Sequence, residues 1–232
     1  MEPRPLRLGR PLLAGSARHW AAAVLVCCAA IVALLGVLFW HRTTAGWLDR
    51  AVDAPFMTWF GGHQGLALWL ASPAELIPAA VLTAAVVITC LLTGRLNGAL
   101  LGAAVPAATE LDERLLKPLV HRTYHGSLVY PSGHATAMFA FAATVTVLLL
   151  VPPRPARFRA LRILIPAAAG VLGVVVAIAV IGLSWHYFTD TVAGAAVGIG
   201  TVCALALIVD LPVVRGVLAR MTRERARPDP EG

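Results

Sequence analysis

Polar side chains that can do chemistry are confined to a few short segments of a chain that is otherwise apolar. These segments hold Lys117, His121, Arg122, His125, Ser132, His134, His186 and Asp190. A Pro-Ser-Gly-His stretch at 131–134 opens a long apolar run, where a serine cap and a glycine leave backbone N–H groups free at the positive end of a helix dipole. A helix start of this kind is suited to bind a phosphate group.

His186 and Asp190 stand four residues apart at the start of another apolar run. On a helix this spacing places the carboxylate beside the imidazole, where it accepts the Nδ1 proton and leaves Nε2 free as a nucleophile. The alternative is a structural pair that ties a helix end to its neighbour, which is the commoner role of an isolated pair. A second histidine, His134, at a phosphate-ready helix start favours catalysis.

The long runs around these segments carry almost no charge. Hydrophobic residues make up 59% of the 232 residues and charged residues 13%, with a mean hydropathy of +0.78. A soluble domain needs more polar residues to cover its surface, so the composition predicts a multi-pass membrane protein. The net charge is +7, but the arginines neither alternate with aromatic residues nor form one stripe, and we expect no nucleic-acid partner. All but one of the 19 basic residues are arginine, which is typical of a GC-rich bacterial genome.

The apolar runs predict an all-α fold in which six transmembrane helices form a bundle. They cover residues 20–40, 73–93, 96–116, 133–151, 161–183 and 187–209. The first run follows a basic N-terminus, as in a secretory signal, but its length of roughly 20 residues spans a bilayer and predicts a retained anchor. Residues 41–65 mix aromatic and charged side chains, which is typical of a segment on the membrane surface.

Two of the predicted helices have distinctive polar or small residues. The last turns of the third contain Glu110, Asp112, Glu113 and Arg114. Charges at this depth are tolerated only against protein or a wet cavity, so that end is expected to face a polar environment. In the sixth helix, Gly194 and Gly198 form a small-xxx-small pair, which we assign to close helix packing.

Basic residues are divided unequally between the two sides of this arrangement. Fourteen lie in the termini, at Arg95 and within 154–162, whereas the other side holds Arg42, Arg50, Arg114, Lys117 and Arg122. The positive-inside rule then places both termini in the cytoplasm and the chemically active segments outside. The expected organisation in the cell membrane is a basic cytoplasmic tail at 1–19, a six-helix membrane domain at 20–209 and a second basic cytoplasmic tail at 210–232.

The order of the polar residues resembles a known family. Lys117 in a basic segment, Pro-Ser-Gly-His at 131–134 and then His186-xxx-Asp190 are similar to the motifs of the type 2 phosphatidic acid phosphatase superfamily, which also includes the vanadium haloperoxidases. The resemblance covers residues 111–198 by motif and the membrane part by architecture.

The resemblance implies that His186 attacks phosphorus to form a phosphohistidine, held and polarised by Asp190. His134 then protonates the leaving group. The phosphoryl oxygens are held by Lys117, Ser132 and the N–H of Gly133. The resemblance implies a metal-independent enzyme without a cofactor, and metal-site spacing is likewise lacking at Cys27, Cys28, Cys90 and Cys203.

The chain departs from the family pattern in two places. Tyr124 and His125 replace the arginine-proline pair that ends the first motif, and Ala179 and Val180 replace the serine-arginine pair that begins the third. Because a hydrogen bond to a charged group is worth about 1.5 to 3 kcal/mol, both losses weaken the phosphate site. Arg122 is the expected substitute cation for the phosphate. The alternative is that Arg122 only pairs with headgroup phosphates at the membrane interface, as boundary arginines commonly do.

The expected activity is hydrolysis of a phosphomonoester or diphosphate of a membrane lipid on the extracytoplasmic face. Phosphatidic acid, phosphatidylglycerol phosphate and polyprenyl diphosphate are the substrate types considered. Two alternatives stay open: a lipid phosphotransferase with the same site, and a non-catalytic protein that binds or moves anionic lipid, which the missing arginines favour. A haloperoxidase is disfavoured because those relatives are soluble. The oligomeric state stays open.

Overall fold

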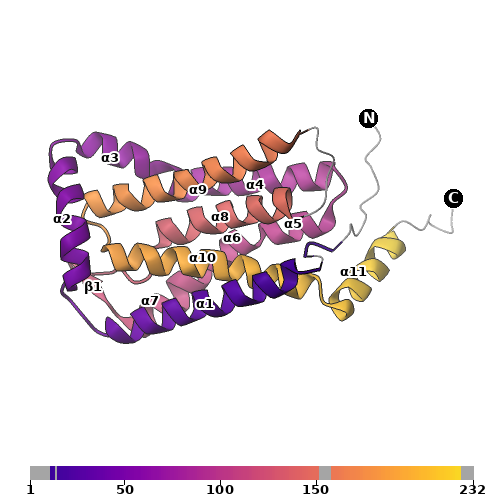
Figure 1. Cartoon of the computed structure of the whole chain (residues 1–232), viewed down its shortest axis with the longest axis horizontal. Coiled ribbons are helices and arrows are strands. Elements are labelled where there is room, and N and C mark those ends of the chain that lie inside the picture. Colours follow the sequence, from indigo (N-terminus) through magenta and orange to yellow (C-terminus); the bar gives the residue numbers. More distant parts are fainter. Residues whose placement is uncertain (1–10, 14, 152–157, 226–232) are drawn as a thin grey trace.

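A computed structural model of the chain describes residues 11–13, 15–151 and 158–225, with backbone alone for 222–225. Most of these residues are helical (Figure 1). The α-helices are α1 Ala17–Leu38, α2 Trp47–Gly61, α3 Gln64–Ala71, α4 Leu76–Leu92, α5 Leu96–Gly102, α6 Ala104–Leu111, α7 Lys117–Val120, α8 Gly133–Leu150, α9 Arg159–Gly182, α10 Phe188–Val209 and α11 Pro212–Arg225. A 3-10 helix (η1 Ser72–Ala74), a π-helix (η2 Asp112–Leu116) and a two-stranded antiparallel hairpin (β1 Thr123–Tyr124, β2 Ser127–Leu128) complete the described chain.

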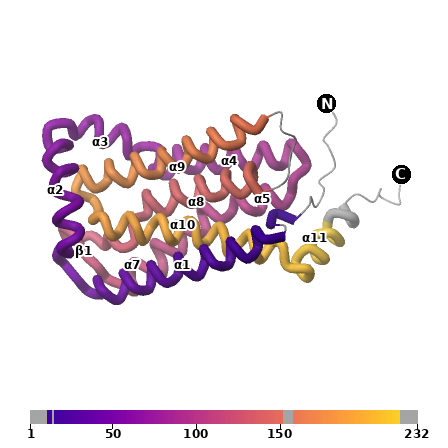
Figure 2. The backbone as a smooth tube through the Cα atoms, viewed as in Figure 1, coloured from indigo at the N-terminus to yellow at the C-terminus, as the bar shows by residue number. Residues whose placement is uncertain are grey.

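Five stretches of the described chain are long and apolar enough to cross a membrane. They are α1, the stretch Gln64–Leu92 that contains α3, η1 and α4, then α8, α9 and α10. The long helices run lengthwise along one bundle (Figures 1 and 2). The predicted all-α membrane fold is confirmed at this level, and α1, α4, α8, α9 and α10 match predicted helices with ends shifted by a few residues.

The third predicted helix, residues 96–116, is broken into α5, α6 and η2. Pro106 has no N–H to offer the carbonyl of Gly102, where α5 ends, so the helical hydrogen-bond ladder is interrupted there. The charged residues that follow lie in the π-helical turn. The number of spans within the described residues is therefore five by length and apolarity, and the six-span arrangement stays a prediction.

Helix α2 runs across one end of the bundle, where α9 ends and α10 begins (Figure 1). Its Asp49, Asp53 and Phe60 are buried, whereas Trp47 and Trp59 are exposed. Phe60 packs so tightly on α9 that a Cβ at Gly182 would meet its ring. The segment predicted to lie on the membrane surface is thus a helix that covers the ends of other helices with its polar face.

Helices α8 and α10 pack backbone to backbone. A Cβ at Gly194 would lie 2.4 Å from the carbonyl oxygen of Ser132, and one at Gly198 would lie 2.5 Å from that of Thr136. The packing role predicted for these two glycines is confirmed. The close approach also brings the Pro-Ser-Gly-His stretch beside the first turn of α10.

The opposite end of the bundle holds the start of α1, the end of α4, the start of α9 and helix α11 (Figure 1). The Asp210 carboxylate accepts the N–H groups of Leu12 and Leu13 at 2.9 and 2.6 Å, and the Arg18 guanidinium donates to its carbonyl. Of the basic residues predicted on this side, Arg4, Arg7, Arg10, Arg154, Arg157 and Arg227 lie outside the described residues.

Candidate active site

The start of α8 forms as the sequence predicts. Ser132 is the N-cap, and its side chain accepts the N–H of Ala135 at 3.5 Å. Ser132 is fully buried and its own N–H donates to the carbonyl of Asp190 at 3.0 Å. Ser132 therefore caps and docks the helix, whereas Gly133, the first residue of α8, faces a cavity.

This polar cavity of about 660 Å³ lies between the hairpin, the start of α8 and the loop that joins α9 to α10. Its lining contains Glu113, Lys117, Tyr124, His125, Ser127, Leu128, Val129, Gly133, His134, Leu183, Ser184, Trp185 and His186. The fold thus brings together Lys117, Gly133, His134 and His186, four of the residues that the sequence assigned to the site. His121 lies elsewhere, with its ring stacked on that of His41.

His186 presents a neutral imidazole to this cavity. The residue is only 8% exposed, and Nδ1 lies 2.9 Å from the carbonyl oxygen of Val129. A carbonyl can only accept, so Nδ1 carries the proton and Nε2 keeps its lone pair. Burial, reinforced by the nearby His134 and Lys117, lowers the pKa of His186 to about 3, although the bond to Val129 opposes the shift. At neutral pH the imidazole is therefore uncharged and able to attack.

His134 stands across the cavity from His186. The ring centroids are 6.2 Å apart, close enough for both imidazoles to reach one phosphoryl group between them. The His134 Nε2 is 3.6 Å from a carboxylate oxygen of Glu75, which lies just before α4. The pair can act as nucleophile and proton carrier on opposite sides of the same group.

Lys117 is the one lysine or arginine among the described residues that line the cavity. Its Nζ pairs with Glu113 at 2.5 Å, and its side chain is 12% exposed. A Cβ at Gly133 would lie 3.1 Å from the Glu113 carboxylate and 3.9 Å from the Lys117 Nζ, so the glycine gives these groups room at the helix start. The charged end of the third predicted helix does face a polar cavity, as expected.

A second, largely apolar cavity of about 530 Å³ adjoins the polar one. It runs along α4 and α6, where Ala79, Ala80, Val87 and Val105 form part of its lining. The two cavities share Glu113, Gly133 and His134. A ligand with a polar head and an apolar chain can therefore place one in each.

The contact between His186 and Asp190 that the sequence predicted does not form. Helix α10 begins at Phe188 with Tyr187 as its N-cap, so His186 lies outside the helix and helical spacing does not bring the two side chains together. The Asp190 carboxylate instead accepts the N–H of Tyr187 at 2.9 Å and the Arg122 guanidinium at 2.6 Å. The carbonyl of Val129 takes the place expected for Asp190.

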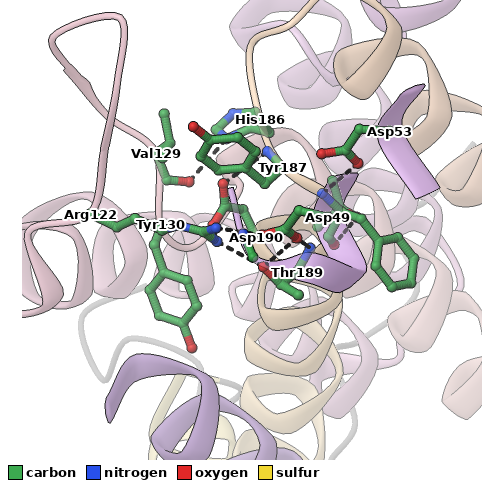
Figure 3. Close-up of polar contacts among 12 residues, drawn as sticks. Asp49, Asp53, Arg122, Val129, Tyr130, His186, Tyr187, Thr189 and Asp190 are labelled. Atoms are coloured by element: carbon green, nitrogen blue, oxygen red, sulfur yellow. Dashed lines mark hydrogen bonds and ion pairs between the residues drawn. The ribbon is translucent and has the colours of Figure 1, made fainter. Parts of the chain in front are cut away.

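Arg122 is also placed differently from the sequence expectation. It is 0% exposed and does not line the cavity. Its guanidinium pairs with Asp49 and Asp190, each at 2.6 Å (Figure 3). The guanidinium also lies against the rings of Phe39 and Tyr187. Two carboxylates satisfy the charge of Arg122, which removes the reason for it to turn toward a phosphate.

The two positions at which the family has an arginine and this chain does not lie in different parts of the fold. Tyr124 and His125 line the cavity, so the end of the first motif still reaches the site without a permanent charge. Ala179 and Val180 are fully buried in an apolar cluster with Met138 and Val176. The third-motif position is thus part of the core.

Several groups at or near the site were missed by sequence reasoning. They are Asp49, Asp53, Glu75 and the carbonyl of Val129. Asp49 and Asp53, four residues apart among aromatic side chains, are the signal that was available, because one helical face then carries both carboxylates. Within the described residues, no three His, Cys, Asp or Glu side chains gather as ligands for a metal ion.

Comparison with known families gives one match. The family model described as the PAP2 superfamily matches residues 74–212, which contain Lys117, His134, His186 and Asp190. Helix α2, with Asp49 and Asp53, lies outside the matched residues. No curated protein and no solved structure matches the chain.

Proposed function

The chain belongs to the PAP2 superfamily, and from this premise we propose that it is a membrane lipid phosphatase that works through a phosphohistidine on His186. The observation that carries the proposal is the pairing of two cavities. A polar cavity with two facing histidines adjoins, at His134, an apolar cavity along α4 and α6. A lipid phosphate has the matching division into a charged head and an apolar chain.

The proposed reaction needs only groups that face the polar cavity. The Nε2 of His186 attacks phosphorus, the bond from phosphorus to the leaving oxygen breaks, and His134, which enters this step protonated, donates its proton to that oxygen. Water then attacks the phosphohistidine, the bond between nitrogen and phosphorus breaks, and His134 takes the proton from the water. Inorganic phosphate leaves and both imidazoles return to their starting states.

Lys117 and the N–H at Gly133 are the proposed donors to the phosphoryl oxygens. A bound phosphate can share Lys117 with Glu113, because the lysine has three N–H donors. Ser132 contributes through its cap on α8, which holds the helix start and its dipole toward the cavity. The sequence expectation of direct contact between the Ser132 hydroxyl and phosphate is replaced by this indirect role.

The proposed substrates are phosphomonoesters or diphosphates of membrane lipids, of the phosphatidic acid, phosphatidylglycerol phosphate or polyprenyl diphosphate type. The proposed topology keeps six spans, with the broken α5, α6 and η2 segment as the third. It places the α2 end outside the cell membrane and residues 1–19 and 210–232 in the cytoplasm. The bundle end opposite α2 supports this topology, because it holds the described ends of α1, α4, α9 and α11 and the basic residues beside them. These residues are Arg18, Arg95, Arg159 and Arg215.

Phosphate release by the purified protein from a panel of these lipids in mixed micelles tests the proposal. Wild type is expected to release phosphate from at least one lipid, and orthovanadate, an analogue of the phosphoryl transition state, is expected to inhibit. Release that is equal in wild type and His186→Asn, or absent for every lipid, would contradict the proposal.

A non-catalytic lipid binder is the second candidate. It is favoured by the scarcity of cations in the polar cavity, where Glu113 already pairs with Lys117. Lipid binding without phosphate release, and without displacement by vanadate, would establish it. A phosphotransferase is separated by adding acceptor alcohols, since it yields a new phosphoester where a hydrolase yields inorganic phosphate.

A further inference from the structure

Three carboxylates satisfy the first free N–H groups of α10, the helix that follows His186. Asp190 accepts from Tyr187 at 2.9 Å, Asp53 from Phe188 at 3.0 Å and Asp49 from Thr189 at 2.9 Å. Two of these acceptors belong to α2, far away in sequence (Figure 3). Helix α2 therefore caps α10 directly after the nucleophile.

Asp49 also anchors Arg122. The Asp49 Oδ2 accepts from Nη2 of Arg122 at 2.6 Å, while Nη1 donates to Asp190 at 2.6 Å and to the Thr189 hydroxyl at 2.7 Å. That hydroxyl donates in turn to Asp49 at 2.8 Å. All four side chains are nearly or fully buried, so every one of these bonds is shielded from water.

Two routes lead from this cluster to His186. The side chain of Arg122 holds Asp190, which holds the N–H of Tyr187, the residue next to His186. The backbone carbonyl of Arg122 accepts the N–H of Val129 at 3.0 Å, and the Val129 carbonyl accepts from His186 Nδ1 at 2.9 Å. Arg122 thus fixes both the peptide before α10 and the carbonyl that orients the imidazole.

We propose that Asp49 is a positioning residue for the nucleophile: with Arg122 and Asp190 it forms a buried carboxylate–guanidinium–carboxylate clamp that holds the Val129 carbonyl against His186 Nδ1. The inference rests on the proposed function. It adds to the site a residue from α2, outside the part of the chain that matches the family. It also gives Arg122 a role that needs no contact with the phosphate.

The charges of the clamp explain why Arg122 needs the carboxylate that α2 supplies at Asp49. The clamp sets two carboxylates against one guanidinium, and the positive end of the α10 helix dipole faces the excess negative charge. Without Asp49, Nη2 of Arg122 would be left buried without its acceptor. Arg122 would then shift toward other acceptors, and Val129, which is hydrogen-bonded to the Arg122 backbone, would move with it.

Asp49→Asn is the most direct test, because it replaces one carboxylate of the clamp by an amide without changing the size of the side chain. The amide oxygen can still accept from Thr189, but the amide N–H₂ faces the guanidinium with donors against donors. Asp53→Asn is the matched control. Asp53 lies on the same helix and is also buried, but it makes no bond to Arg122. Its bond from the Phe188 N–H is one that an amide oxygen can still accept. Thr189→Val, which removes the hydroxyl between Arg122 and Asp49, serves as a milder second variant.

Two measurements are made on wild type and each variant. In steady-state kinetics, Asp49→Asn is expected to lower kcat about tenfold or more with KM nearly unchanged, since Asp49 does not touch the substrate, and Thr189→Val is expected to show a smaller loss. In spectra of ¹⁵N-histidine protein, His186 is assigned by its loss in His186→Gln. Wild type and Asp53→Asn are expected to hold the proton on Nδ1 alone, whereas Asp49→Asn shows a mixture of both neutral tautomers.

A His186 tautomer that is the same in Asp49→Asn as in Asp53→Asn would overturn the proposal, as would equal kcat values for these two variants. If wild type released no phosphate from any lipid, the proposed function would fail, but the tautomer comparison would still decide whether the clamp orients His186. If Asp49→Asn could not be purified folded, the tautomer ratio and kcat of Thr189→Val would decide in its place.

Discussion

Among single residues, substitutions of His186 and His134 are expected to separate attack on phosphorus from protonation of the leaving group. His186→Ala removes the nucleophile and is expected to reduce turnover of every substrate at least ~10³-fold. His134→Ala removes only the proton donor, so an aryl phosphate such as a nitrophenyl ester, whose leaving group needs no proton, should react much more readily than a lipid phosphate. Phosphate release from both substrates is the measurement. Near-normal rates for His186→Ala on any substrate would refute the assignment of the nucleophile.

Asp53 gives a prediction about pH. Burial, with a contribution from Asp49, raises the pKa of Asp53 from 3.8 to about 7. The folded protein then holds a proton that the unfolded chain has released, so its free energy of unfolding falls as pH rises from 3.8 to about 7. Asp53→Asn has no proton to lose. Thermal unfolding in detergent between about pH 4 and pH 8 should show the variant gaining stability over wild type as pH rises. A constant difference across that range would count against the raised pKa.

The sequence alone predicted part of the candidate site. Lys117, Gly133, His134 and His186 were found because their order and spacing match a motif, and all four line one cavity. The role of Arg122 was not predictable, because its partner Asp49 is 73 positions away in a segment without a motif. Local helical spacing also misled at His186, since the helix starts two residues after it.

At the scale of elements, the contact between α8 and α10 fixes the site because it joins the phosphate-ready helix start to the helix after His186. A side chain at Gly198 has no room, since its Cβ would lie 2.5 Å from the Thr136 carbonyl and 2.7 Å from the Ala140 nitrogen. Gly198→Val is expected to destabilise the protein by about 1–3 kcal/mol or more, through forced separation of the helices. Thermal unfolding in detergent measures this.

Gly170→Ala is the control for that substitution. It lies inside α9, and a Cβ there would meet nothing within 4 Å. Its expected effect is neutral or slightly stabilising, because alanine favours helix more than glycine does. Equal unfolding temperatures for Gly198→Val and Gly170→Ala would mean that α8 and α10 are not in backbone contact.

Element boundaries followed from apolar runs wherever a run formed one unbroken helix, as in α1, α8, α9 and α10. Residues 96–116 show the limit of that approach. Hydropathy records how apolar the run is, but the break between α5 and α6 depends on the missing N–H of Pro106 and on packing with neighbours. Likewise, aromatic residues in 41–65 indicated a surface segment without revealing that α2 caps α10.

For the whole molecule, the division of basic residues predicts which end faces outward. Ser127 in the hairpin and Ala160 near the start of α9 are both exposed and lie toward opposite ends of the bundle. In intact cells, a cysteine at Ser127 is expected to react with an impermeant thiol reagent, whereas one at Ala160 should react only after permeabilisation. The opposite pattern would place the catalytic cavity in the cytoplasm.

Trapping of the covalent intermediate tests the central claim most directly. Purified wild type is mixed with a ³²P-labelled lipid phosphate, quenched within the time of one turnover, and digested for mass spectrometry. We expect a phosphoryl group on the peptide that contains His186, labile to acid and stable to alkali, and absent from His186→Asn. Phosphate release by wild type without any labelled His186 peptide, or with the label on another residue, would contradict the phosphohistidine mechanism.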